Sequence, residues 1–442
     1  MKATHSAVPV VLAASFLMVW MHFQPVPVSS ELIGSALAFV DLLVKGDFNS
    51  AVERFDETMK AASPPDKLKG AWTAITEQLG PFKQRTDARQ EPAGPYQFVF
   101  VTCQFDKDTI DIKLVFNASK QIAGMFFVPA YKAPGYARPA SFTEKEVTVG
   151  SGEWALPGTL TVPTGSGPFP AVVLVHGSGP NDRNEAIGPN RPFQDLAWGL
   201  ASRGIAVLRY DKRSRVYQAK VLKIPEFTVK DETIDDALAA VGLLRHNPAI
   251  DPNRIFVLGH SLGGMLAPRI GARDSRLAGL VIMAGNTRPI GQAMVDQLEY
   301  LISLGGPRAE ANKATLVTVK AQLDRLKDPN LPSTAIVIGA PSSYWRDLDA
   351  YNPGLAAASL KMPILILQGE RDYQVTLEDL AGWKKYLSGR TSVEFKTYPK
   401  LNHLFEEGDG KSRPEEYSNR GNVAPYVIED IARWVQGPRT RN

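Results

Sequence analysis

Ser261 is the residue whose surroundings point most directly to chemistry. It stands between Gly259 and Gly263, directly after the apolar run at 255–258. That run predicts a buried strand and residues 262–270 suit a helix, so the serine falls on the turn between them. Small flanking residues let the backbone turn sharply enough to present a hydroxyl above a sheet edge. The pattern predicts a catalytic nucleophile, and the alternative is an ordinary glycine-rich turn.

A nucleophilic serine needs a base near neutral pH, and the base needs a group to orient it. Outside the first 30 residues the histidines are His176, His246, His260 and His403. We expect the sharp turn to aim His260 away from its neighbour Ser261, and His246 suits the C-terminus of a helix. His403 follows the last predicted strand, on a loop that can reach over the sheet edge. His403 is therefore the predicted general base.

The acid that orients the base is expected between Ser261 and His403 in chain order. Asp372 lies just beyond the predicted strand at 364–368, and Glu370 on the same loop is its rival. The loop after the preceding strand contains no carboxylate, which removes the other usual position. Asp372 is the predicted acid, and the alternative is an aspartate that only caps the turn.

The oxyanion formed by such a nucleophile needs backbone donors that are fixed in advance. The Leu262 N–H, at the start of the helix after the serine, is one expected donor. The loop His176–Gly179 follows the apolar strand at 171–175, and its glycines allow close approach of a ligand. We expect Ser178 N–H as the second donor and Gly177 as the less favoured choice. The alternative is a plain exit from the strand.

Composition narrows the class of protein. The 442 residues are 44% hydrophobic and 22% charged, with a net charge of +4, which is ordinary for a soluble protein of two or three domains. No long basic run occurs, so nucleic acid is not an expected partner. The single cysteine, Cys103, suits a buried inert thiol. No Cys/His cluster has zinc spacing, and neither a metal nor an organic cofactor is expected.

Residues 1–30 have the pattern of an export signal. Lys2 precedes an apolar stretch from Val8 to Trp20, and a Pro-bearing polar segment follows. The apolar core is short for a membrane span, which disfavours the alternative of an uncleaved anchor. We expect a signal peptide, a periplasmic or extracellular protein and no membrane contact beyond export. No feature predicts an oligomeric state.

Two different patterns follow one another along the rest of the chain. From 31 to about 79 apolar residues recur at helical spacing, and at 110–116 they alternate as in a half-buried strand. Helices followed by strands predict a small α+β domain at 31–130. Residues 131–142 form a predicted linker. Beyond it, short apolar runs alternate with amphipathic helices, which predicts a mostly parallel sheet with helices on both faces at 143–442.

The interval at about 286–360 contains no convincing core strand. Leu316, Val319, Leu323 and Leu326 recur at helical spacing, so part of it is an amphipathic helix. Ligand crevices in open sheets lie outside the carboxyl ends of the strands. We therefore expect a helical lid insertion above Ser261, with a surface embellishment as the alternative. Within it, Tyr344, Trp345 and Tyr351 are expected to pack the lid core rather than to line an acyl pocket.

Charged residues crowd the end of another predicted strand, at Arg209–Arg213. One interpretation is that they shape the pocket or bind an acidic group of a substrate. The favoured interpretation is an internal ion-pair cluster that ties down the glycine loop, since such networks often serve structure.

From about residue 142 to its end the chain resembles the α/β-hydrolase superfamily, and within it the bacterial serine esterases. The resemblance rests on Val-Leu-Val-His-Gly-Ser-Gly-Pro at 173–180, Asp-Leu-Ala-Trp-Gly-Leu-Ala-Ser-Arg-Gly at 195–204 and Arg-Tyr-Asp-Lys-Arg at 209–213. The family's catalytic triad maps onto Ser261, Asp372 and His403. Residues 31–130 resemble a small α+β domain that precedes such hydrolases in exported bacterial proteins.

The residues and the resemblance together predict a serine esterase that cleaves small to medium acyl esters through an acyl-enzyme. Its expected partner is a small-molecule ester. Two alternatives stay open. One is a serine peptidase, amidase or acyl-transferring hydrolase of the same fold. The other is an envelope binding module in which residues 31–130 hold the ligand.

Overall fold

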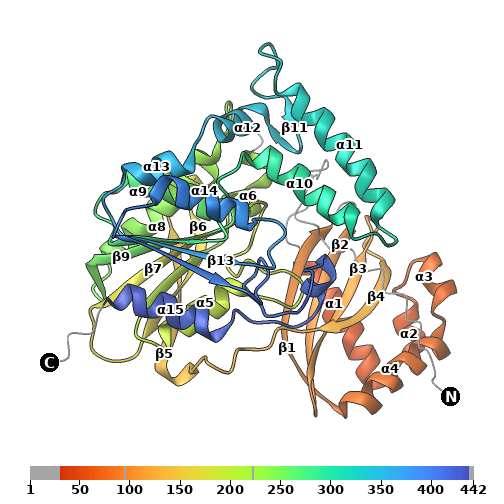
Figure 1. Cartoon of the computed structure of the whole chain (residues 1–442). Helices are drawn as coiled ribbons and strands as arrows, with labels where there is room; N and C mark the ends of the chain where they lie inside the picture. Colours follow the sequence, from red (N-terminus) through yellow and green to blue (C-terminus); the bar gives the residue numbers. More distant parts are fainter. Residues whose placement is uncertain (1–29, 94–95, 222, 438–442) are drawn as a thin grey trace. The chain divides into compact units, whose positions relative to one another are not determined.

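Residues 30–93, 96–221 and 223–437 are described in the computed structural model of the chain (Figure 1). The chain divides into two units, one ending at Lys132 and the other beginning at Ala133. The predicted signal peptide lies outside the described residues except for Ser30. No helix within the described ranges has the length and apolar character needed to cross a membrane.

The N-terminal unit packs helices against one antiparallel sheet. Leu32, Ala36, Val40 and Leu43 recur at helical spacing along α1, and all four are buried against the sheet. The sheet has the order β1-β2-β3-β4, and each neighbouring pair is antiparallel. The elements of this unit are α1 (Ser30–Lys45), α2 (Phe48–Val52), α3 (Glu57–Ala62), α4 (Pro65–Leu79), β1 (Phe82–Ala93), β2 (Tyr96–Phe105), β3 (Thr109–Phe116) and β4 (Ile122–Pro129).

The second unit is built on a sheet that, within the described residues, has eight strands in the order β14-β13-β10-β9-β7-β8-β6-β5. Neighbouring strands from β14 to β8 run parallel, whereas β6 is antiparallel to both β8 and β5. Its strands are β5 (Phe142–Val149), β6 (Leu156–Pro163), β7 (Phe169–Val175), β8 (Ala206–Tyr210), β9 (Ile250–His260), β10 (Gly279–Met283), β13 (Ile364–Gly369) and β14 (Val393–Tyr398).

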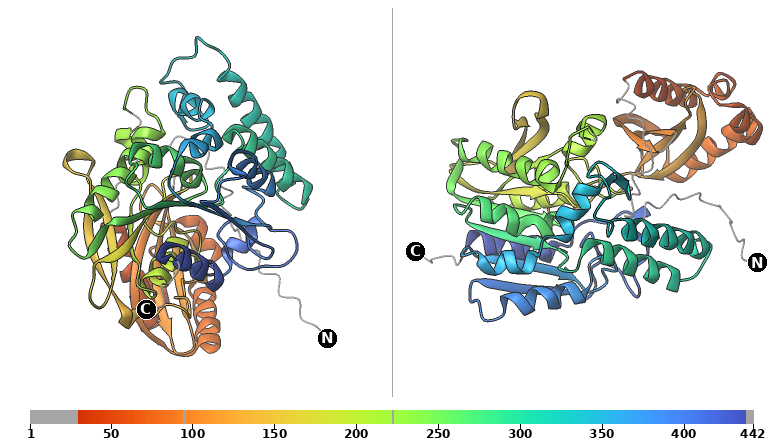
Figure 2. Two further views of the ribbon diagram at one scale, coloured as in Figure 1. Left: turned by 60° about the vertical axis from the view of Figure 1, so that its left-hand side comes forward. Right: turned by 90° about the horizontal axis from the view of Figure 1, so that it is seen from above.

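Helices cover both faces of this sheet because its strands are apolar on both sides. Along β7, Val173 and Val175 face one hydrophobic cluster, and Val172 and Leu174 face the other. Helices α8 (Asp235–Arg245), α9 (Leu262–Arg273) and α14 (Leu377–Leu387) complete the first cluster, and α5 (Pro192–Ala201) and α15 (Pro425–Gln436) complete the second. The left view of Figure 2 has the dark blue α15 and the green α8 and α9 on opposite sides of the sheet. The fold class expected from the sequence is confirmed.

Between β10 and β13 the chain leaves the sheet and forms mostly helices. Helices α10 and α11 pack side by side as a pair (Figure 1). Leu298 of α10 and Val319 of α11 are buried in the same hydrophobic cluster. The elements here are α10 (Ile290–Ser303), α11 (Ala309–Arg325), β11 (Ile336–Val337), β12 (Ala340–Pro341), α12 (Ser342–Asp349) and α13 (Pro353–Ser359). Short helices also follow β8, as α6 (Arg213–Val216), α7 (Gln218–Val221) and a π-helical turn (Lys230–Ile234).

Candidate active site

Ser261 occupies a strained turn between β9 and α9. Its φ of 54° and ψ of −119° put a non-glycine residue at positive φ. Two glycines make the turn possible, because a Cβ on Gly259 would lie 2.1 Å from the carbonyl oxygen of Gly263, and a Cβ on Gly263 would lie 2.2 Å from that of Val175. The Ser261 amide donates to the Met283 carbonyl at 2.9 Å, which ties the turn to β10.

His403 and Asp372 lie on loops that follow β14 and β13. These strands run parallel to β10 and β9, so both loops emerge at the edge of the sheet where Ser261 lies. His403 Nδ1 donates to Asp372 Oδ2 at 2.6 Å, and both side chains are fully buried. Glu370, the rival acid, is exposed. The geometry therefore brings Asp372, and not Glu370, to the imidazole of His403.

His246 and His176 make contacts that do not involve Ser261 or Asp372. His246 ends α8, where its Nδ1 lies 2.8 Å from the Gly242 carbonyl. His176 is buried against Phe193 and Tyr210, and burial lowers its pKa to about 4. It is therefore uncharged near neutral pH.

His260 hydrogen-bonds to residues other than its neighbour Ser261, as the sequence predicts. Its Nδ1 lies 2.8 Å from Oε2 of Glu185, and its Nε2 lies 2.9 Å from the carbonyl oxygen of His403. The two imidazole rings are 4.7 Å apart between centroids. Sequence reasoning missed Glu185, because nothing marks this loop residue except its place eight positions after Gly177.

The glycine loop after β7 is held from two sides. The Gly177 amide donates to Oε1 of Glu185 at 2.6 Å. Gly177 N–H, the less favoured of the two predicted oxyanion donors on this loop, is therefore already engaged. The Gly177 carbonyl accepts from Nζ of Lys212 at 2.8 Å. In a planar trans peptide the Ser178 N–H points opposite to that carbonyl, and so away from Lys212. Ser178 and Leu262 line the same cavity as Ser261.

The charged segment after β8 is an internal ion-pair cluster, so the structural interpretation of it is confirmed. Asp211 pairs with Arg183 at 3.0 Å, and Lys212 lies 3.4 Å from the buried Glu232. Arg213 pairs with Asp236, whose pKa burial raises to about 6.

The cavity above Ser261 has a volume of about 90 Å³. The residues 286–360 supply most of its lining, from α10 and from α12 with the turn before it. The insertion residues of the lining are Asn286, Ile290, Ala293, Met294, Gln297, Ile338, Tyr344, Trp345 and Leu348. Tyr344 and Trp345 pack in the core cluster, as expected, and they also line the cavity, which was the alternative. Tyr351 only packs against that cluster.

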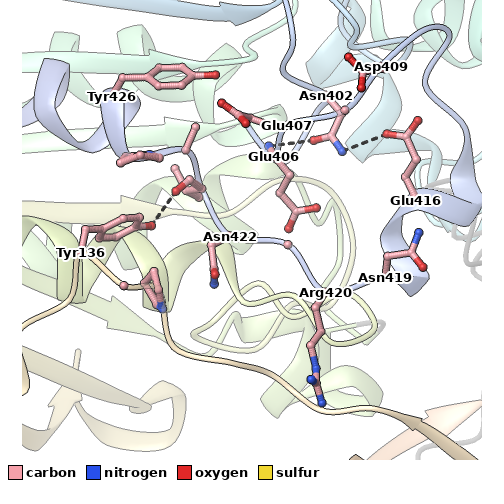
Figure 3. A pocket seen from close by; sticks show the side chains of 17 residues that line it. Tyr136, Asn402, Glu406, Glu407, Asp409, Glu416, Asn419, Arg420, Asn422 and Tyr426 are labelled. Atoms are coloured by element: carbon pink, nitrogen blue, oxygen red, sulfur yellow. Dashed lines mark hydrogen bonds between the residues drawn. The ribbon is translucent and has the colours of Figure 1, made fainter. Parts of the chain in front are cut away.

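A second cavity, of about 910 Å³, lies between the segment at 134–136 and the loops at 402–426 (Figure 3). Glu406 lines it and is nevertheless 5% exposed. Burial, with the nearby charge of Asp195, raises the pKa of Glu406 to about 8. Ser261 does not line this cavity, so it is separate from the candidate active site.

Metal ligands are not gathered in the described part of the chain. No group of three or more His, Cys, Asp or Glu residues there is arranged to hold a metal ion. Cys103 is buried, and burial raises the pKa of its thiol to about 12.

Comparison with known proteins links both units to described families. Residues 168–408 match the family described as "Serine aminopeptidase, S33", and residues 36–125 match a "Protein of unknown function (DUF3887)". The chain is 41% identical over 404 residues to "Esterase EstD" of Thermotoga maritima, covering 90% of this chain and 94% of the relative.

Solved esterases are similar at lower identity. A hyperthermophilic esterase from the archaeon Pyrobaculum calidifontis is 19% identical, with a TM-score of 0.44, over 66% of this chain and 85% of that one. Est1E from Butyrivibrio proteoclasticus is 16% identical, with a TM-score of 0.42, over 65% of this chain and 99% of that one.

Proposed function

The chain belongs to the serine aminopeptidase S33 family of α/β-hydrolases, and we propose that within this family it is a carboxylic ester hydrolase with Ser261 as its nucleophile. The name and the 41% identity of the Thermotoga maritima relative support ester hydrolysis as the activity. The buried His403–Asp372 pair, with its 2.6 Å hydrogen bond beside the Ser261 turn, is the observation that carries the assignment of roles.

In the proposed reaction Ser261 attacks the acyl carbon while His403 takes the hydroxyl proton. Asp372 holds the imidazole with its proton on Nδ1, so that Nε2 is the atom that accepts. The Leu262 and Ser178 amides stabilise the oxyanion. His403 then returns the proton to the leaving alcohol, and water activated in the same way hydrolyses the acyl-enzyme.

The proposed substrates are small to medium esters whose acyl group enters the cavity above Ser261. Its volume of about 90 Å³ and its mostly apolar lining from the insertion, such as Ile290, Met294 and Leu348, suit a short acyl chain. The insertion acts in this proposal as a lid that covers the reacting atoms.

The family description favours a second candidate, hydrolysis of aminoacyl amides. An acyl-enzyme can form from an amide as well as from an ester, so the catalytic residues do not separate the two. Turnover of a panel of p-nitrophenyl esters, compared with that of aminoacyl p-nitroanilides, separates the two activities. Faster turnover of the anilides would assign the protein as a peptidase.

The proposal is tested with Ser261→Ala. We expect the variant to lose turnover of p-nitrophenyl acetate and labelling by a fluorophosphonate while its circular dichroism stays that of the wild type. Ser303→Ala, an exposed serine of α10, is the matched control and should retain both. A wild-type protein that resists the label would instead favour a binding module, and a Ser261→Ala variant with full turnover would remove the proposed nucleophile.

Export remains part of the proposal and rests on the charge and length pattern of residues 1–30. The test is the N-terminal sequence of the protein recovered from separated cell fractions. A start near residue 30 in the periplasm or medium is expected, and an intact Met1 in the cytoplasm would contradict it.

A further inference from the structure

Glu185 and His260 form a buried pair that connects the two loops of the candidate active site. Glu185 is fully buried and His260 is 3% exposed. The carboxylate accepts the Gly177 amide on Oε1 at 2.6 Å and contacts His260 Nδ1 with Oε2 at 2.8 Å. His260 Nε2 lies 2.9 Å from the His403 carbonyl. One chain of hydrogen bonds therefore runs from the loop of Ser178 to the loop of His403.

The chemistry of these partners fixes the role of the His260 ring. A carbonyl oxygen only accepts, so Nε2 of His260 carries a hydrogen and donates it to His403. Nδ1 then shares its proton with the Glu185 carboxylate. Burial alone would lower the pKa of His260, but the charge and hydrogen bond of Glu185, the hydrogen bond to the His403 backbone and the charge of Asp372 together outweigh burial, and the pKa is raised. Because both ring nitrogens are engaged, His260 is not available as a base for Ser261.

The backbone at Glu185 is also unusual. Its φ of 51° is one of the positive values at non-glycine residues, like that of Ser261. Such conformations persist where the surrounding structure holds them, and they cluster at functional sites. A buried ion pair is weak evidence for stability, since its desolvation offsets its attraction. A role in geometry accounts for the pair better than a role in stability.

We propose that Glu185 and His260 are positioning residues that hold the proposed oxyanion loop and the proposed general base in one fixed geometry. The inference rests on the function proposed above and names two residues that act through others. Glu185 fixes the Gly177 amide at the start of the oxyanion loop, and His260 fixes the backbone carbonyl of His403. A displacement of about 1 Å at reacting groups costs on the order of 10²-fold in rate, so losing either contact should be felt in kcat.

The experiment compares Glu185→Ala, Glu185→Gln, His260→Phe and the double variant Glu185→Ala/His260→Phe. With p-nitrophenyl acetate we expect kcat to fall about 10- to 100-fold in the alanine and phenylalanine variants, with KM within about threefold. Glutamine can still accept the Gly177 amide and can donate to Nδ1 of a neutral His260, so we expect it to restore most of kcat. The double variant should be no slower than the slower single one, because the two residues act as a unit.

Asp274→Asn is the matched control, since Asp274 pairs with Arg245 at 2.7 Å at the other end of α9. Its kcat should stay near the wild-type value at a temperature where every variant is folded by circular dichroism. Wild-type kcat in a folded Glu185→Ala variant would overturn the inference. So would a Glu185→Gln variant as slow as Glu185→Ala, or additive losses in the double variant.

Two further measurements keep the inference testable. If the alanine and phenylalanine variants do not fold, NMR of ¹⁵N-histidine in the wild type decides it: His260 must keep a hydrogen on Nε2 wherever the enzyme is active, and an unprotonated Nε2 overturns the inference. Fluorophosphonate labelling of the wild type separates the two proposals. An unlabelled wild type refutes the serine hydrolase, whereas a labelled wild type with unaffected variants refutes only the positioning pair.

Discussion

Asp372 holds His403 with one carboxylate oxygen while its other oxygen is held by the backbone. Oδ2 accepts from His403 Nδ1 at 2.6 Å, and Oδ1 accepts the amides of Gln374 at 2.8 Å and Val375 at 3.0 Å. The two amides fix the plane of the carboxylate. Its orientation toward the imidazole is therefore set before any substrate binds.

Asp372→Asn should lower kcat by about 10³- to 10⁴-fold without unfolding the protein. The two backbone amides need an oxygen, so the new side chain should keep its carbonyl at the Oδ1 position and turn its NH₂ toward His403. The imidazole then carries its proton on Nε2 and cannot accept one from Ser261. Steady-state kinetics test this, with the exposed Glu370→Gln as the control that retains activity. Equal losses in both variants would contradict the assignment of the acid.

Lys212→Met should reduce both stability and kcat. Lys212 is buried, and its loss leaves Glu232, which is 1% exposed, without its cationic partner 3.4 Å away. Removing one partner of a buried pair costs about 3–5 kcal/mol. It also releases the Gly177 carbonyl and with it the peptide that carries the Ser178 N–H. Urea unfolding and steady-state kinetics measure the two effects.

The double variant Lys212→Met/Glu232→Gln separates these effects. Neutralising Glu232 should recover much of the lost free energy of unfolding, but kcat should stay low because the Gly177 carbonyl still lacks its donor. Lys230→Met, at an exposed lysine, is the control for both measurements. Recovery of kcat together with stability would mean that Lys212 acts only through the fold.

The sheet and the loops of the candidate site were predictable because their signals are local. The apolar runs at 171–175, 255–258 and 364–367 are buried on both faces, so each indicates a central strand. Ser261 and Asp372 lie shortly after the ends of two of these runs, and His403 lies on the loop after the less buried strand β14. Parallel strands then bring their ends to one edge without any further information from the sequence.

The features that were missed depend on contacts between distant residues. Strand β1 (Phe82–Ala93) is mostly polar and, among the described strands, lies at the edge of its sheet beside β2, so it has no buried alternation to indicate it. Glu185 gains its role from His260, which lies 75 positions away. Tyr344 and Trp345 are core residues by composition, and only the path of the insertion brings them to the cavity.

Met294→Ala should broaden the range of acyl chains that the enzyme accepts. Met294 is half-buried on α10 and lines the cavity above Ser261, so its truncation enlarges a space of about 90 Å³. We expect kcat/KM for p-nitrophenyl octanoate to rise relative to that for the acetate by about tenfold, the effect of one or two methylenes in an apolar pocket. Val317→Ala, at a residue of α11 that is 70% exposed, should leave the ratio unchanged. An unaltered ratio in Met294→Ala would place the acyl group elsewhere.

The stability of the protein should fall as pH rises from 7 to 9 because of Glu406 (Figure 3). Burial first, and the charge of Asp195 next, raise the pKa of Glu406 from 4.5 to about 8, so in that interval the folded state holds a proton that the unfolded chain has released. The group's contribution to stability is complete below pH 4.5 and is lost as pH rises through about 8.

Glu406→Gln removes this titration and tests the assignment. Between pH 7 and 9 the wild type should lose about 1–1.5 kcal/mol more than the variant, and the variant should be the more stable protein at pH 9. His176, with its pKa lowered to about 4, and Asp236, with its pKa raised to about 6, titrate at lower pH. His260, whose pKa is also raised, titrates in both proteins and cancels from the difference between them. Urea unfolding at a series of pH values measures the slopes. Parallel slopes for the two proteins would mean that Glu406 is already ionised in the folded state at pH 7.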